Sequence, residues 1–366
     1  MTVADDLDRA RSALQMINPA PYNAEAPPEA LAGELTPSNL HYVRSNFPLP
    51  YHDGTLEVGG AVQHPTSLTL EDLRALPAIE RAVTLECAGN GRLDMRPLPT
   101  GEPWGDYAVS TARWTGARLS DVLERVQPNA DGVDVRFEGA DHGAYHLRPV
   151  LADTSKDDLT FVRALPLAHA ADPSAEILIA YEMNGEPLGA DHGAPFRLIA
   201  PHWYAVASVK WLKRIDVLTE VYTGEFQTGH YMYEWADRPH EPVTFMRVRA
   251  RMTDPAPGST IPTGTCTLRG KAWSGTGPVT RVELSFTGAG DWYPAQLESP
   301  QGPYQWQNWT FDWDATAVGR HTIRVRATDA AGNVQPEVPP WNRLGYGNNA
   351  IEVPYLDVTP NDSPSA

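Results

Sequence analysis

The sequence predicts an α+β domain followed by an all-β sandwich, and three observations support that prediction. The 366 residues include 34 Pro, 29 Gly, 11 Trp and 14 Tyr, a composition typical of short strands and loops rather than of helical bundles. From residue 42 to about 238 short strands alternate with short helices, and beyond that stretch come runs in which apolar and polar residues alternate. The length also fits two domains of about 100–200 residues each.

Three segments follow one another along the chain. Residues 1–40 hold one plausible helix, at 6–16, and then a proline-rich stretch, so we expect an arm rather than a domain. The α+β domain is expected to span 41–240 and the sandwich 241–366, because the character of the sequence changes after the turn-rich residues 237–243.

Local patterns justify the elements of the α+β domain. Apolar and polar residues alternate at 56–62, which predicts a strand, whereas the spacing at 68–77 and at 119–126 predicts helices. Ser120 stands at the start of the second helix, where we expect its hydroxyl to cap the helix.

The sandwich is predicted from alternating runs with turns between them. The runs lie at 245–252, 281–288, 309–314 and 321–329. Short strands at this spacing are typical of a β-sandwich of about 110 residues. Cys266 lies in a further strand-like run, where a small buried hydrophobic residue is the ordinary role of a cysteine.

The charge balance excludes one large class of function. With 29 basic and 46 acidic side chains the formal net charge is −17, and such a field repels nucleic acids and anionic membranes. An anionic ligand therefore needs a local basic pocket. No apolar run approaches the ~18 residues of a membrane span, and the first 15 residues show neither a signal-peptide core nor twin arginines. We therefore expect a cytoplasmic chain without nucleic-acid or membrane partners.

The run TLECAGNGRLDM, 84–95, presents a thiol at the end of a strand. Cys87 is followed by small, turn-forming residues and then, five positions on, by Arg92. Such geometry lets the backbone approach a ligand closely. As a thiolate, Cys87 is suited to bind a transition metal or to act as a nucleophile, and the alternative is an inert buried cysteine. Zinc is disfavoured, since no second cysteine or suitably spaced histidine stands nearby.

A second run, 181–215, gathers cations around an alternating strand. Arg197 and Lys210 stand inside apolar stretches, which predicts an anion held deep in the fold. For Lys213 and Arg214 a solvated basic edge is an equally good interpretation.

Together these two runs carry a family resemblance. CAGNGR, with YEMNGEPL, DHGAPFR and SVKWL further along, closely resembles the sulfite oxidase family, the mononuclear molybdenum enzymes that include sulfite oxidases and assimilatory nitrate reductases. Similar runs at 21–50, 110–123 and 332–358 extend the resemblance over nearly the whole chain. It implies a molybdopterin-binding domain of the haem-free type, followed by an immunoglobulin-like dimerisation domain.

The resemblance also implies a cofactor and its contacts. Cys87 would be the thiolate ligand of one molybdenum per chain, bound to one molybdopterin, and no haem is expected. The other cofactor contacts it implies are Tyr42, Val43, Arg44, Ser45, Asn46, Asp141, His192, Arg197, Ser208, Val209 and Lys210.

On the substrate side, the resemblance implies that Arg44 and Arg92 bind an oxyanion, beside the pocket tryptophan Trp104. Tyr231 matches the catalytic tyrosine, with Arg44 and Arg92 as further catalytic residues, and Tyr222 and Tyr233 stand close by in the sequence. Gln307 departs from the family, because a pocket arginine is usual there, and Ala207 likewise stands where an arginine is common.

The expected function is molybdenum-dependent oxidation of sulfite to sulfate by oxygen-atom transfer in a homodimer. Oxygen or a separate acceptor would take the electrons. Reduction of another oxyanion or of a sulfoxide at the same centre is the alternative reaction. A cofactor-free interaction protein is the alternative of a different class, and the retained Cys87, Arg92 and Lys210 argue against it.

Overall fold

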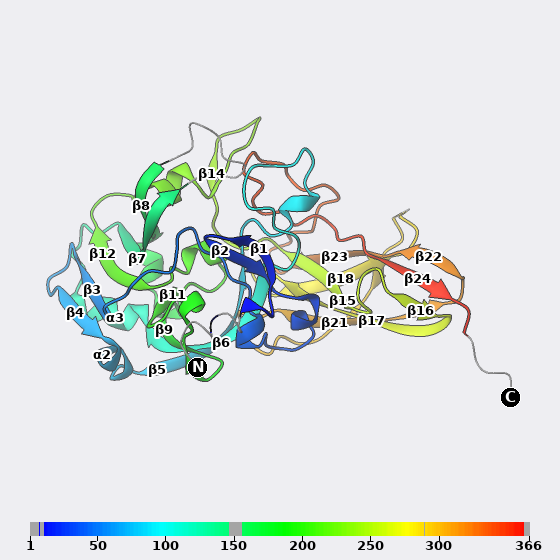
Figure 1. Ribbon diagram of the computed structural model, residues 1–366, viewed down its shortest axis with the longest axis horizontal. Helices are drawn as coiled ribbons and strands as arrows, with labels where there is room; N and C mark the ends of the chain where they lie inside the picture. The colour runs from blue at the N-terminus through cyan, green and yellow to red at the C-terminus, as the bar shows by residue number, and fades with distance from the viewer. Residues whose placement is uncertain (1–6, 8–10, 146–155, 289, 362–366) are drawn as a thin grey trace. The chain divides into compact units, whose positions relative to one another are not determined.

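The computed structural model describes residues 7, 11–145, 156–288 and 290–361 (Figure 1). The chain forms two compact units. The first comprises Met1–Pro27, Leu35–Thr244 and Trp341–Asn348, and the second comprises Pro28–Glu34, Phe245–Pro340 and Asn349–Ala366. The three consecutive segments that we expected are therefore interleaved: the N-terminal 40 residues divide between the units, and 341–348 returns to the first unit.

One antiparallel sheet of the first unit contains the strand that leads into the run with Cys87. Its strand order is β10-β9-β6-β5, and β11 also pairs with β9. The strands are β5 (Ala78–Glu86), β6 (Val109–Arg118), β9 (Leu178–Met183), β10 (Glu186–Pro187) and β11 (Arg197–Ile199).

The other large sheet of the first unit is mixed. Its order is β4-β3-β12-β7-β8, with β12 parallel to β3 and antiparallel to β7. The strands are β3 (Thr55–Gly60), β4 (Thr66–Thr69), β7 (Asp134–Tyr145), β8 (Lys156–Pro166) and β12 (Leu212–Leu218). The strand predicted at 56–62 is confirmed as β3.

Short helices connect these strands, and both predicted helices are present as α2 (Leu70–Arg74) and α3 (Leu119–Val126). A third, α4, spans Leu167–Ala170. The predicted cap by Ser120 is wrong: the N-cap residue of α3 is Arg118, without a side-chain cap, and the Ser120 hydroxyl faces Asp121 at 3.4 Å. Among the described residues, no helix combines the length and the apolarity needed to cross a bilayer.

The helix predicted at 6–16 is wrong at its C-terminal end. Leu7 and Arg11 are helical, but Gln15 begins strand β1 (Gln15–Pro19), which pairs with β2 (Tyr22–Glu25). Residues 6 and 8–10 of the predicted helix lie outside the described residues. Backbone pairing of Ala24 with Val43 ties this hairpin to the fold, and such long-range contacts override local helix propensity.

The second unit is the predicted β-sandwich, built from three small sheets. Their orders are β15-β17-β21-β20, β16-β24-β22 and β19-β18-β23. Its core includes Leu268, Val282, Trp309 and Val325, and Cys266 packs against that core while only half-buried. The strands are β15 (Arg249–Asp254), β16 (Thr260–Pro262), β17 (Gly264–Trp273), β18 (Val279–Ser285), β19 (Tyr293–Pro294), β20 (Gln296–Leu297), β21 (Gln307–Ala315), β22 (Gly319–Thr322), β23 (Arg324–Asp329) and β24 (Tyr355–Thr359).

Gly116 permits the close approach of β6 to β9 at the bulge between them. A Cβ atom at Gly116 would lie 2.2 Å from the Ile179 carbonyl oxygen. We therefore expect Gly116→Ala to force the strands apart and to lower the free energy of unfolding by about 1–3 kcal/mol in urea denaturation. At Gly59 the nearest atom to an added Cβ is 3.7 Å away, so Gly59→Ala is the matched control. Equal unfolding midpoints for the two variants would contradict the expectation.

Candidate active site

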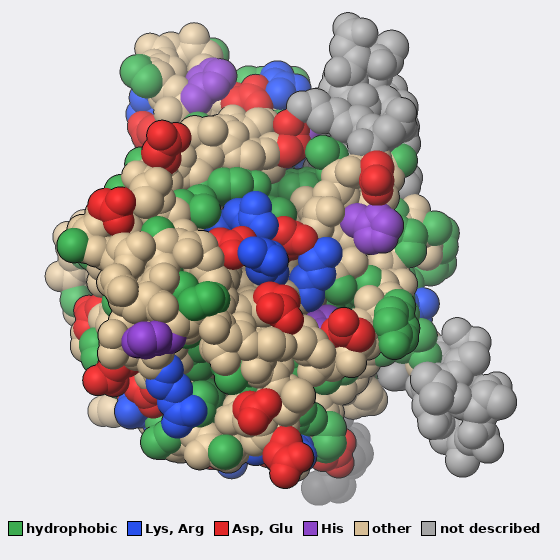
Figure 2. Space-filling model, turned by 90° about the vertical axis from the view of Figure 1, so that its left-hand side faces the viewer, with side chains coloured by type: hydrophobic (Ala, Val, Ile, Leu, Met, Phe, Trp, Pro, Cys, Tyr) green, Lys and Arg blue, Asp and Glu red, His purple; other side chains and the backbone are tan. Residues whose placement is uncertain are grey.

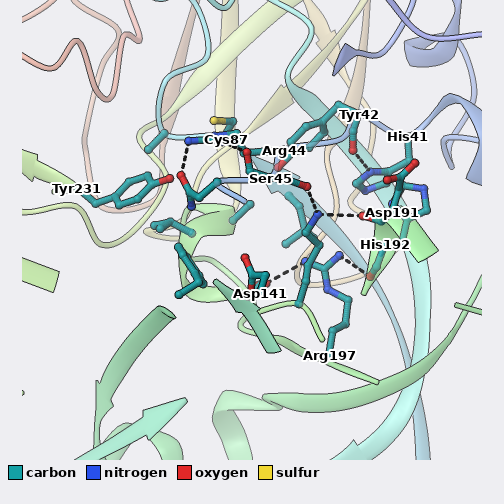
Figure 3. A pocket seen from close by; sticks show the side chains of 18 residues that line it. His41, Tyr42, Arg44, Ser45, Cys87, Asp141, Asp191, His192, Arg197 and Tyr231 are labelled. Atoms are coloured by element: carbon teal, nitrogen blue, oxygen red, sulfur yellow. Dashed lines mark hydrogen bonds between the residues drawn. The ribbon is translucent and has the colours of Figure 1, made fainter. Parts of the chain in front are cut away.

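A pocket opens within the first unit and is lined by 18 residues (Figure 3). Both large sheets contribute to it: Cys87 follows β5, and Asp141 and Phe161 stand on β7 and β8. The structure brings together eleven of the predicted site residues here, namely Tyr42, Arg44, Ser45, Asn46, Cys87, Asp141, His192, Arg197, Ser208, Lys210 and Tyr231.

Cys87 is held by the backbone of a tight turn at the end of β5. Its N–H donates to the Ala108 carbonyl at 2.9 Å, and its own carbonyl accepts from the Asn90 N–H at 2.9 Å. The side chain is buried, and burial raises the pKa of the thiol, while Arg44 and, more weakly, Arg92 oppose that rise. A thiolate at this position therefore needs a further positive partner, such as a metal ion.

Arg44 presents a fixed guanidinium beside the thiol. It donates to the Asn23 side chain at 3.2 Å, and also to the Ser45 carbonyl and the Asn46 side chain. These partners orient the planar group, which is the geometry that binds an oxyanion with two hydrogen bonds.

Two further cations line the pocket. Lys210 donates to the Ser45 hydroxyl and to the Asp191 carbonyl, both at 2.9 Å, and burial, followed by repulsion from Arg197, lowers its pKa to about 7. Arg197 donates to the Ser208 carbonyl at 2.9 Å and to the His192 carbonyl at 3.1 Å, and burial lowers its pKa to about 10. Because their hydrogen bonds go to neutral oxygens, a bound anion would stabilise both charges.

The pocket histidines are neutral. Burial, Lys210 and Arg197 together lower the pKa of His192 to about 3, and its Nε2 lies 3.1 Å from the Ser38 carbonyl. Burial, followed by His192, lowers the pKa of His41 well below its usual value. The Nδ1 of His41 lies 2.9 Å from the Tyr42 carbonyl, while its Nε2 has no hydrogen-bond partner.

Two carboxylates line the same pocket. Burial raises the pKa of Asp141 to about 6 against the attraction of Lys210, and its Oδ1 has no hydrogen-bond partner. The charge of the Asp191 carboxylate is balanced by Arg11, which does not line the pocket and which donates to both carboxylate oxygens at 2.8 Å. The unpartnered atoms of Asp141 and His41 leave hydrogen-bonding capacity for a polar ligand.

Four predicted residues of the first unit do not line the pocket. Arg92 is buried, and its guanidinium donates to the carbonyls of Leu344 and Glu102, at 3.0 and 2.6 Å. Trp104 is only 1% exposed. Val43 pairs through its backbone with Ala24, and Val209 accepts from the Leu198 N–H. A direct contact of these four residues with a ligand stays a prediction.

Gln307 belongs to the second unit, where its amide bonds to its own sandwich. Its Oε1 accepts from the Val279 N–H at 2.7 Å, and its Nε2 donates to the carbonyls of Val279 and Glu298. These bonds give the glutamine a structural role, and a contact with substrate stays a prediction.

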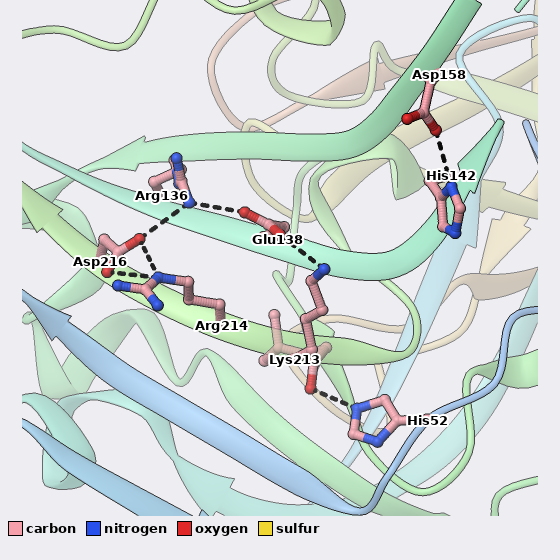
Figure 4. Close-up of polar contacts among 9 residues, drawn as sticks. His52, Arg136, Glu138, His142, Asp158, Lys213, Arg214 and Asp216 are labelled. Atoms are coloured by element: carbon pink, nitrogen blue, oxygen red, sulfur yellow. Dashed lines mark hydrogen bonds and ion pairs between the residues drawn. The ribbon is translucent and has the colours of Figure 1, made fainter. Parts of the chain in front are cut away.

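Lys213 and Arg214 stand on β12 and do not line the pocket. Lys213 pairs with Glu138 at 2.9 Å, and Arg214 pairs with Asp216 at 2.8 Å (Figure 4). Figure 2, which views the molecule from the side of β3, β4 and β12, shows Lys and Arg side chains beside Asp and Glu side chains there. Both side chains are partly exposed, which supports a solvated surface, but β12 lies in the interior of its sheet and not at an edge.

Sequence reasoning missed several lining residues, among them His41, Phe161 and Asp191. Asp191 begins the run DHGAPFR and His41 precedes Tyr42, so both stood beside predicted contacts. Phe161 gave no signal, because a buried strand residue looks the same whether or not it faces a cavity.

Comparison with known proteins identifies the class. Residues 46–226 match the family described as oxidoreductase molybdopterin binding domain, and 241–352 match the Mo-co oxidoreductase dimerisation domain. The fold is thus that of a molybdenum-cofactor oxidoreductase, as predicted. The chain belongs to the sulfite oxidase family of these enzymes, which confirms the resemblance seen in the sequence.

Individual relatives extend over nearly the whole chain. Mitochondrial sulfite oxidases of Mus musculus and Homo sapiens are each 35% identical over 382 residues, covering 98% of this chain and 68% of theirs. Nitrate reductase [NADH] 2 of Phaseolus vulgaris is 33% identical, over 93% of this chain and 42% of its own length. Among solved structures, the sulfane dehydrogenase SoxCD of Paracoccus pantotrophus has a TM-score of 0.80 at 25% identity, covering 95% of this chain and 89% of that one.

The residues of the pocket fit the molybdenum cofactor. Cys87 offers the soft thiolate that such a metal prefers, and the metal would in turn stabilise the thiolate in its buried position. Arg197 and Lys210 are suited to hold the cofactor's terminal phosphate, since buried cations with neutral partners favour a dianion. The unpartnered atoms of Asp141 and His41 can bond to the polar ring system.

His192 makes the folding stability depend on pH. Its pKa falls from 6.5 to about 3 on folding, so the unfolded chain binds a proton that the folded chain does not. We therefore expect the free energy of unfolding to decrease as the pH drops from about 6.5 towards 3. The variant His192→Gln can still donate to Ser38, so it should weaken this dependence in urea titrations at pH 7 and pH 5. An unchanged dependence would show that His192 is already protonated in the folded chain.

Proposed function

We propose that this protein oxidises sulfite to sulfate at one molybdenum ion bound by Cys87. The observation on which the proposal rests is the guanidinium of Arg44, held in a fixed orientation beside the thiol in a pocket rich in buried cations. Sulfite is a small, nearly divalent oxyanion, so this local positive field attracts it despite the net charge of −17.

Some pocket residues are suited to bind the substrate and the cofactor, and one is suited to orient the transferred oxygen. When bound, the cofactor supplies the oxygen transfer and accepts two electrons. Arg44 would bind the oxyanion near Cys87, while Arg197 and Lys210 would hold the cofactor phosphate. Tyr231 lines the same pocket, and in Figure 3 its phenol oxygen points towards the side on which Arg44 and Cys87 lie. We assign this phenol to orienting the oxygen that is transferred.

Arg92 acts on the Cys87 thiol through its charge. Its guanidinium is locked between carbonyls, but it still counteracts the rise in the pKa of the Cys87 thiol. It therefore favours the thiolate form that binds a metal. The second unit matches a dimerisation domain, which supports a homodimer, and electrons would leave to oxygen or to a separate acceptor protein.

Reduction of nitrate is the second candidate. Its support is the similarity to a nitrate reductase of Phaseolus vulgaris at 33% identity. Both reactions use an oxyanion and the same metal, and the cations of the pocket favour sulfite, which is nearly divalent, over the singly charged nitrate.

Steady-state assays distinguish the two reactions. We expect the protein, purified from a host that makes molybdopterin, to oxidise sulfite with ferricyanide, cytochrome c or oxygen as acceptor. With a reduced viologen dye as donor, we expect its turnover of nitrate to be far slower. A protein that reduces nitrate efficiently and leaves sulfite unchanged would overturn the proposal.

The two free cysteines provide a matched pair of variants. A hydroxyl is a hard, weak ligand for molybdenum, so we expect Cys87→Ser to lower turnover by roughly two orders of magnitude or more while the protein stays folded. Cys266 packs in the sandwich, and Cys266→Ser should leave both turnover and molybdenum content unchanged. Molybdenum per chain, measured by mass spectrometry, and circular dichroism complete the comparison. Near-normal activity of Cys87→Ser would make Cys87 a packing residue.

A further inference from the structure

A buried arginine stands behind the pocket tyrosine. Arg163 lies on β8 and is 1% exposed, among the largest fully buried side chains of the chain. Among the described residues, none of the ion pairs involves Arg163, and its Nε has no hydrogen-bond partner. Burying a cation without a carboxylate costs stability, and an apolar residue of similar volume would avoid that cost.

The guanidinium joins the two ends of the segment that carries Tyr231. One Nη donates to the carbonyl of Phe226, and the other donates to the carbonyl of Val243 at 3.4 Å. Val243 in turn donates its N–H to the Tyr231 carbonyl at 2.8 Å. Arg163 thus closes a loop, 226–243, whose only described pocket-lining residue is Tyr231.

Tyr231 needs such support, because its backbone is in an unfavourable conformation. Its φ is +57°, in the left-handed region that side chains other than glycine rarely adopt, so surrounding contacts must hold it there. Its ring stacks on Tyr346, with centroids 5.2 Å apart and planes 20° apart. The Arg163 guanidinium carbon lies 5.9 Å from the centroid of the Tyr231 ring. Tyr231 is therefore held by three contacts: the loop closure, the stack and the cation.

The electrostatics agree with this geometry. Burial lowers the pKa of Arg163 to about 10, and the neighbouring Tyr231, Tyr346 and Tyr222 counteract that decrease. The guanidinium stays charged at neutral pH, so its attraction to the tyrosine rings is present under working conditions.

We propose that Arg163 is a positioning residue, which fixes the Tyr231 phenol in the pocket by closing the 226–243 loop and by contacting the tyrosine ring. The proposal rests on the proposed function in one respect, that Tyr231 orients the transferred oxygen. Because Arg44 and the other pocket cations do not depend on Arg163, loss of Arg163 should impair turnover more than substrate binding.

A double-mutant cycle tests the proposal in the molybdenum-loaded protein. We expect Arg163→Gln to keep its metal and to lower kcat about ten- to a hundredfold, with KM for sulfite changed by less than about threefold. In a Tyr231→Phe background the same change should have little further effect, since the phenol it positions is gone. Arg136→Gln, which removes partly buried ion pairs to Glu138 and Asp216 away from the pocket, is the control and should leave kcat unchanged. Equal losses of kcat in both backgrounds would overturn the proposal.

A spectroscopic readout separates failure of this proposal from failure of the proposed function. In protein labelled with 3-fluorotyrosine, the resonance that disappears in Tyr231→Phe reports the Tyr231 ring. We expect that resonance to shift or broaden in Arg163→Gln and to stay in place in Arg136→Gln, whatever the substrate. If Arg163→Gln does not fold, Arg163→Lys replaces it, because lysine keeps the charge but reaches fewer carbonyls. In that variant we expect a smaller shift of the Tyr231 resonance from its position in the unsubstituted protein. An unchanged Tyr231 resonance in the folded Arg163 variant would overturn the proposal even if sulfite is the substrate.

Discussion

Buried positive charge is the constraint on which the pocket depends. Arg197 and Lys210 lie inside the first unit with hydrogen bonds to carbonyl and hydroxyl oxygens, and burial lowers the pKa of both. Such an arrangement is unfavourable when empty and favourable around an anion, so it commits the pocket to an anionic cofactor or substrate. The net charge of −17 acts in the opposite sense, so an anion depends on the local positive field of the pocket for its binding.

Rigid backbone places the reactive thiol relative to those cations. Cys87 follows the nine-residue strand β5, which pairs along its whole length with β6, and a backbone bond to Ala108 continues that register to the thiol. Across the pocket, Asp141 and Phe161 come from the paired strands β7 and β8. The side chains on both sides of the pocket stand on paired strands or directly after one. Displacing them would therefore require whole sheets to move.

Tyr231 depends on a different kind of support. The loop that carries it contains only short elements, which are the helical turn Glu225–Gly229 and the paired strands β13 (Met232–Tyr233) and β14 (Glu241–Pro242). Contacts with Arg163 and Tyr346 and further backbone bonds hold it in position. Tyr346 belongs to 341–348, the segment that returns to the first unit after the strands β15 to β23. The same segment supplies the Leu344 carbonyl that accepts from Arg92. The segment 341–348 thus helps to order both Tyr231 and the turn that follows Cys87.

The sequence by itself determined the features that rest on local pattern: alternation predicted the sandwich, and helical spacing predicted α2 and α3. The runs around Cys87 and Lys210 carried the family resemblance, and that resemblance implied most of the pocket residues. Only the tertiary structure decided that Arg92 faces carbonyls, that Gln307 bonds within its own sandwich, and that Arg163 lies behind Tyr231. The physical reason is distance along the chain: Arg92 and Leu344 are 252 residues apart, and no local periodicity encodes which partner a buried polar side chain will meet.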